Sequence, residues 1–74
     1  MLTYDQTYSI LGQFFNACLK FWWSAGKGKR EAWELSIKDI EGLTADPYSP
    51  QGELLDVEAK ELFVKYRKLD LGKK

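Results

Sequence analysis

The sequence predicts an all-α fold, a small three-helix bundle with helices at about residues 3–25, 29–41 and 50–71. Two long stretches carry apolar residues at helical spacing, and glycines stand where the first two helices are expected to end. A chain of 74 residues is the size of one domain, so residues 1–74 are expected to form a single small helical domain.

The first helix is predicted from its start signal and from a long apolar stripe. Thr3 and Gln6 have the spacing of a capping box. Gly26 is placed to end the helix. Gly12 interrupts the pattern at a cost of about 1 kcal/mol against alanine; a close backbone approach and chance both explain it. The stripe consists of Tyr4, Tyr8, Leu11, Phe15, Cys18, Trp22 and Ala25.

The second helix has a shorter apolar pattern. Trp33, Ile37 and Ile40 follow helical spacing, and Gly42 is placed to end the helix. A strand is the alternative, because Trp33, Leu35 and Ile37 also alternate with polar residues. The content of alanine, glutamate and lysine favours the helix.

The third helix is expected to begin after a loop that contains two prolines. Ser49 is a suitable cap, with Pro50 in the first helical position. Gly72 is the expected stop. The predicted stripe consists of Leu55, Ala59, Leu62, Tyr66 and Leu69, with Phe63 beside it.

Composition excludes several classes of protein. The formal net charge is zero, although residues 1–30 carry +3, residues 31–62 carry −7 and residues 63–74 carry +4. An overall attraction to nucleic acid or membrane is therefore not expected. With no histidine and one cysteine, Cys18, neither a zinc site nor another cofactor is expected. No apolar run of about 20 residues and no signal peptide are present, so we expect a cytoplasmic protein without a membrane partner.

Three consecutive aromatic residues form the first candidate site. Phe21, Trp22 and Trp23 lie about 100° apart around a helix, so one stripe cannot bury all three. Trp22 belongs to the main stripe and is expected in the core, whereas Trp23 is the best candidate for exposure. Exposed aromatic residues are typical anchors of protein interfaces.

A basic cluster forms the second candidate site. Lys27, Lys29 and Arg30 crowd the start of the second helix, where the helix dipole is already positive. The acidic middle segment, or solvent and salt, can neutralise these charges. The alternative is an anion site at the helix start, with a tryptophan stacking on a base. The stretch lacks the first glycine and the Ser or Thr of a P-loop.

These features predict a protein-interaction module rather than an enzyme. The chain has no histidine, and its carboxylates have no known catalytic spacing. We expect an adaptor, regulator or inhibitor whose partner is another protein or itself, with self-association through the aromatic surface of Phe21, Trp22 and Trp23. The alternative function is binding of nucleic acid or phosphate by the basic loop at residues 26–30.

Overall fold

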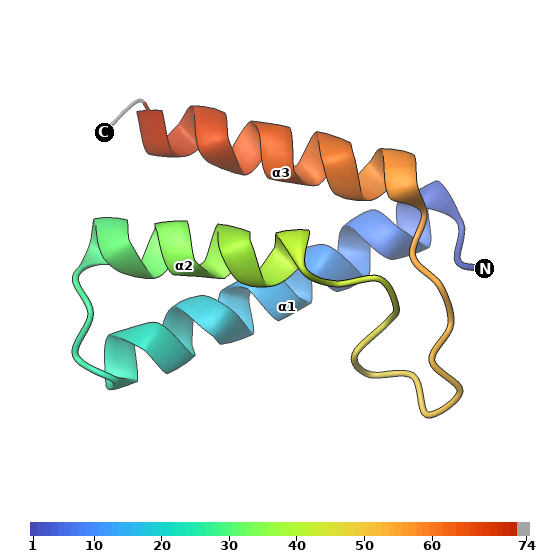
Figure 1. The fold of residues 1–74 in the computed structure, drawn as a ribbon, viewed down its shortest axis with the longest axis horizontal. Coiled ribbons are helices and arrows are strands. Elements are labelled where there is room, and N and C mark those ends of the chain that lie inside the picture. The colour runs from blue at the N-terminus through green and yellow to red at the C-terminus, as the bar shows by residue number, and fades with distance from the viewer. Residues whose placement is uncertain (73–74) are drawn as a thin grey trace.

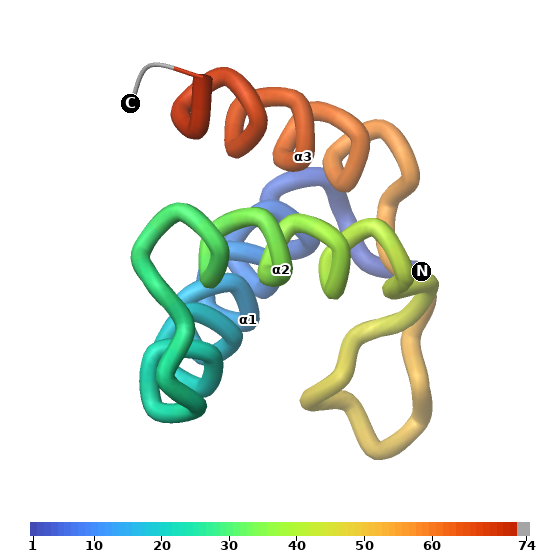
Figure 2. The backbone as a smooth tube through the Cα atoms, turned by 60° about the vertical axis from the view of Figure 1, so that its left-hand side comes forward, coloured from blue at the N-terminus to red at the C-terminus, as the bar shows by residue number. Residues whose placement is uncertain are grey.

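The computed structural model describes residues 1–72 and confirms the predicted three-helix bundle. The helices are α1 (Tyr4–Ser24), α2 (Lys29–Glu41) and α3 (Val57–Gly72). Each helix contacts both of the others. Figure 1 shows that α2 runs back past α1, and that α3 runs in the opposite direction to α2 along one edge of the molecule. The view in Figure 2 places α3 at the same edge.

The predicted start and end of α1 are confirmed. The Thr3 hydroxyl accepts from the Gln6 backbone N–H at 3.2 Å, and the Gln6 side chain accepts from the Thr3 N–H at 3.1 Å. Gly26 has a φ of 90° and follows the last helical turn, where left-handed backbone favours glycine. Apart from its chain neighbours and the backbone of its own helix, no heavy atom of the described residues lies within 4 Å of a Cβ built at Gly12. Close approach of another backbone therefore does not explain that glycine.

The segment with the strand-like alternation is helical. Gly28 is the N-cap of α2 and contributes no side-chain hydrogen bond. Gly42 follows the last residue, as predicted, and the Leu43 backbone N–H donates to the Ile40 carbonyl at 3.0 Å. The ammonium of Lys60, on α3, donates to the carbonyls of Glu41 and Leu43. A side chain from α3 therefore satisfies carbonyl groups at the end of α2.

The predicted start of α3 at residue 50 is wrong. The segment from 44 to 55 folds back on itself, with a bridge between Ala45 and Leu54 and a left-handed φ of 65° at Gly52. A helix cannot pass through that conformation. The cap is Asp56 rather than Ser49, because its carboxylate accepts from the Ala59 backbone N–H at 2.9 Å.

The predicted apolar stripe of α3 is also wrong in part. Tyr66 and Leu69 are exposed, whereas Ala59 and Phe63 face the interior. The guanidinium of Arg67 lies over the Phe63 ring, 4.8 Å from its centroid, and 5.9 Å from that of Phe15. A cationic side chain thus occupies part of the inner face by stacking on aromatic rings, which a pattern of apolar residues does not reveal.

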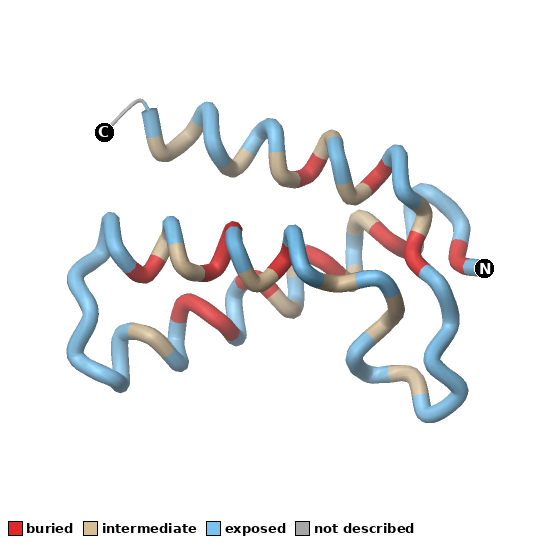
Figure 3. The backbone as a smooth tube through the Cα atoms, viewed as in Figure 1, coloured by how far each residue is buried: buried red, intermediate tan, exposed pale blue. Residues whose placement is uncertain are grey.

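The core lies between the three helices, where Figure 3 shows the buried segments. No helix among the described residues is long and apolar enough to cross a membrane. The main buried residues of the core are Leu2, Leu11, Phe15, Leu19, Ala32, Ile37, Ile40, Leu55 and Phe63.

Candidate functional site

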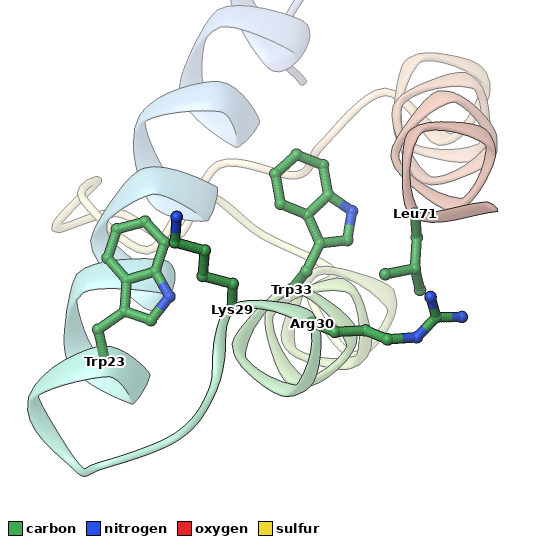
Figure 4. Close-up of a pocket in the computed structure, with 5 residues that line it drawn as sticks. All are labelled: Trp23, Lys29, Arg30, Trp33 and Leu71. Carbon is green, nitrogen blue, oxygen red and sulfur yellow. The ribbon is translucent and has the colours of Figure 1, made fainter. Parts of the chain in front are cut away.

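A pocket of about 410 Å³ lies where the end of α1, the start of α2 and the end of α3 meet. We call it the tryptophan pocket. In Figure 4, Trp33 lies between one pair of side chains, Trp23 and Lys29, and another, Arg30 and Leu71. The lining residues are Trp23, Lys29, Arg30, Trp33 and Leu71.

Helix geometry and a short turn direct Trp23 to this pocket. Trp22 points toward α2, and the next residue is rotated by about 100° from it. The Gly26 and Lys27 backbone N–H groups donate to the carbonyls of Trp23 and Trp22, each at 3.0 Å. The turn therefore brings the start of α2 back against the last residues of α1. Trp23 remains 46% exposed.

Trp33 is fixed by contacts with the other two helices. Its indole N–H donates to the Arg67 carbonyl on α3 at 2.9 Å. Its ring meets the Phe15 ring of α1 edge-on, with centroids 4.9 Å apart. This wall of the pocket is thus held by a hydrogen bond and by core packing.

Lys29 and Arg30 supply positive charge beside the aromatic walls. Arg30 forms an exposed ion pair with Glu34 at 3.4 Å, which is a weak interaction in water. Lys29 forms no ion pair within residues 1–72. Both cations lie in the first turn of α2, where the helix dipole adds a positive potential. Lys29 and Arg30 thus give the pocket a cationic edge, with Glu31 in the same helical turn.

In the structure, some residues of each candidate site line the tryptophan pocket and the others lie outside it. Trp23 from the aromatic group and Lys29 and Arg30 from the basic group line one pocket. Phe21 is 63% exposed and does not line the pocket. Lys27 is exposed and also lies outside the lining.

Trp22 has a structural position. Its indole N–H donates to the Asp39 carboxylate on α2 at 3.0 Å, and the ring is half-buried against the core. The ring of Phe21 packs edge-on against it, with centroids 5.0 Å apart. Trp22 thus joins α1 to α2, and its role as a partner anchor stays a prediction.

Two lining residues are absent from the site residues that the sequence predicts. Trp33 belongs to the predicted apolar face of its helix, and no motif distinguishes Leu71. No local pattern indicates that either residue borders a pocket, since their positions depend on the packing of α3. The one signal in the sequence is that a second tryptophan, Trp33, follows Trp23 on the far side of the expected turn.

The pocket offers apolar surface and positive charge, and Cys18 lies outside it. No three His, Cys, Asp or Glu side chains in the described part of the chain are placed to hold a metal ion. Burial, reinforced by the charge and hydrogen bond of Asp39, raises the pKa of the Cys18 thiol from 9.0 to about 11. That thiol is a poor nucleophile at neutral pH. The apolar walls and cations of the pocket suit an apolar group that carries a neighbouring negative charge.

No protein-family model, curated protein or solved structure matches this chain.

Proposed function

We propose that this protein is a protein-interaction module without enzymatic activity, and that its tryptophan pocket receives an apolar side chain from an acidic segment of a partner protein. The observation that supports this proposal is that Trp23 and Trp33 share one pocket with Lys29 and Arg30. Aromatic and arginine side chains are enriched among the residues that dominate protein interfaces.

The two kinds of contact have different roles in the proposed interaction. Burying a leucine-sized side chain contributes about 1.5–3 kcal/mol. An exposed ion pair contributes about 0.2–1 kcal/mol, and salt weakens it. The indole walls therefore supply most of the affinity, and Lys29 and Arg30 select acidic segments over basic ones.

The test is an NMR titration with two short peptides. In one peptide a leucine is flanked by glutamates, and in the other by lysines. The acidic peptide is expected to shift the signals of Trp23 and Trp33 and to bind at least about tenfold more tightly than the basic one. Trp23→Ala is expected to weaken this binding, because it removes one wall.

Matched charge variants separate the pocket from the rest of the basic loop. Lys29→Gln is expected to weaken binding of the acidic peptide, whereas Lys27→Gln leaves it unchanged, because Lys27 lies outside the pocket. Equal effects of the two substitutions, or equal binding of the two peptides, would contradict the proposed role of the pocket.

We further propose that this protein self-associates. This part of the proposal is supported by the number of large apolar side chains that are left in contact with water, since burying such surface is favourable. Analytical ultracentrifugation at increasing protein concentration tests self-association. A protein that stays monomeric at millimolar concentration would contradict this part of the proposal. The exposed side chains are Met1, Tyr4, Phe21, Trp23, Tyr48, Leu54, Val57, Tyr66 and Leu69.

The alternative proposal is that the loop at residues 26–30 binds nucleic acid or phosphate. It is supported by Gly28, which caps α2 without a side-chain acceptor, and by the exposed basic residues around it. Titration of single- and double-stranded oligonucleotides at low and moderate salt is the test. Here Lys27→Gln is expected to weaken binding as much as Lys29→Gln, and no binding at low salt would exclude this function.

A further inference from the structure

Helix α3 carries a second surface of interest, separate from the tryptophan pocket. Its buried residues, Ala59 and Phe63, define an inner face. The opposite side, which we call the outer face, gathers residues that lie close together at about 100° per residue. In Figures 1 and 2 no other described segment lies beyond α3 on this side. The outer face consists of Val57, Glu58, Glu61, Lys65, Lys68 and Leu69.

Apolar side chains run along the outer face and past its edge. Val57 is 67% exposed and Leu69 is 52% exposed. Beside the outer face, Leu62 and Tyr66 border a hollow of about 400 Å³ that they share with Tyr4 of α1. This surface exists because α3 turns Ala59 and Phe63 inward, which leaves Tyr66 and Leu69 of the predicted stripe in solvent.

The charges of the outer face are separated along the helix. Glu58 and Glu61 occupy its first half, and Lys65 and Lys68 its second half. Glu58, Glu61 and Lys65 form no ion pair within residues 1–72. Lys68 contacts Glu41 at 3.4 Å, in a pair that is exposed on both sides. The outer face therefore presents charges whose partners can be supplied by another molecule.

We infer that a second copy of this chain docks on the outer face, with the two α3 helices antiparallel about a twofold axis. In one register of this pair, Glu61 of each copy faces Lys65 of the other. The same register places Glu58 opposite Lys68. Each ionic contact then occurs twice, because a twofold interface is self-complementary.

The same register brings Val57 of one copy to the level of Leu69 of the other, on the flanks of the charged contact. A parallel arrangement in register would instead place like charges side by side. The order of charges also complements the dipole of α3. The dipole, however, does not account for the exposure of Val57 and Leu69 on either side of these charges.

The dimer is expected to be weak. A helix of 16 residues is about 24 Å long, at 1.5 Å per residue. An interface of that length falls in the small class, below about 1,200 Å², which is typical of transient complexes. Among the described residues of α3, only Leu71 lines the tryptophan pocket, and Leu71 is not part of the outer face. The proposed dimer therefore leaves the pocket open to another partner.

Charge reversal in single and mixed samples tests this inference, which rests on the self-association part of the proposed function. Glu61→Lys and Lys65→Glu each place like charges opposite one another twice, so each variant alone is expected to dimerise about tenfold more weakly. When the two variants are mixed, every reversed charge again faces its opposite, and a heterodimer is expected to form. Sedimentation equilibrium measures both effects at low salt.

The mixing step keeps the test independent of folding, because a misfolded variant cannot regain binding by mixing. Circular dichroism of each variant is the further control. A wild-type dimer that neither charge reversal weakens would overturn the inference. If Phe21→Ala or Trp23→Ala then abolished that dimer, the aromatic surface would be the site of self-association. A wild-type monomer at every concentration removes both the inference and self-association. The peptide titration tests the pocket separately.

Discussion

At the scale of single residues, one carboxylate links two side chains of α1 to α2. Asp39 accepts the Trp22 indole N–H and lies beside the buried thiol of Cys18. Its negative charge favours the indole donor and disfavours a neighbouring thiolate. The same residue therefore helps to hold Trp22 in place, and it adds to burial, the larger cause, in raising the pKa of the Cys18 thiol.

We predict that Cys18 reacts as a thiol of high pKa. Its alkylation by iodoacetamide in the folded protein should increase with pH toward a midpoint near 11, and in urea toward one near 9.0. Because the thiolate is disfavoured in the folded state, the stability linked to Cys18 is complete below about pH 9 and is lost as the pH rises toward 11. Asp39→Asn should lower the native midpoint in part, since burial remains. A native midpoint near 9 would contradict this prediction.

We predict that Ser36→Ala stabilises the protein. The hydroxyl of Ser36 is fully buried and has no hydrogen-bond partner among the described residues. An unsatisfied buried polar group costs about 1–3 kcal/mol, so its removal is expected to raise the free energy of unfolding by about 1 kcal/mol. Urea denaturation measures the change. Ser9→Ala, at an exposed position of α1, is the control and should shift stability by less than about 0.5 kcal/mol.

At the scale of helices, the sequence predicted α1 and α2 well because their ends are marked by local chemistry. The Thr3 and Gln6 box and Gly26 act within a few residues of the ends that they define. The start of α3 depends on distant contacts instead. The Leu2 backbone N–H donates to the Leu54 carbonyl at 2.9 Å, which helps to hold that residue out of the helix. Ser49 followed by Pro50 is a strong local pattern for a helix start, and these distant contacts override it.

Asp56→Ala is predicted to destabilise the protein by about 1 kcal/mol, because it removes the cap of α3. Ser49→Ala is predicted to change stability by less than about 0.5 kcal/mol, since Ser49 caps no helix. Thermal or urea unfolding of the two variants distinguishes the observed start of α3 from the one predicted from sequence. A larger loss for Ser49→Ala would contradict the assignment.

Gly12→Ala is predicted to increase the free energy of unfolding by about 0.5–1 kcal/mol. The position is in the middle of α1, and a Cβ there meets no heavy atom of the described residues within 4 Å apart from its chain neighbours and the backbone of its own helix. Gly26→Ala is the matched comparison, and it should destabilise, because its φ of 90° is unfavourable for alanine. Urea denaturation of both variants checks the sign. A loss of stability in Gly12→Ala would show that the site needs a glycine.

At the scale of the whole molecule, the sequence identified three of the five residues that line the tryptophan pocket. Trp23, Lys29 and Arg30 were recognised, but as parts of two separate sites. These three residues come together because the short turn between α1 and α2 is a local feature of the chain. The contributions of Trp33 and Leu71 require α3 to be in place. Helical periodicity describes each helix alone and does not specify which faces meet.

The hydrogen bond from the Asp56 backbone N–H to the Thr7 hydroxyl, at 3.0 Å, has a consequence for the order of folding. It joins residues that are 49 positions apart, whereas the turn between α1 and α2 closes over only a few. Closing the longer loop costs more chain entropy before its contacts form. We therefore expect the α1–α2 hairpin to be organised in the folding transition state and the junction of Thr7 with Asp56 to form after it.

Thr7→Val tests this order, because it leaves the part-buried Asp56 N–H without its acceptor, at an expected cost of about 1–3 kcal/mol. If the junction forms late, the loss should appear almost entirely as faster unfolding, with the refolding rate nearly unchanged in stopped-flow experiments. Slower refolding would place the junction in the nucleus. The loop at residues 44–56 would then act as an early organiser of the fold, rather than as the last segment to close over a hairpin that is already formed.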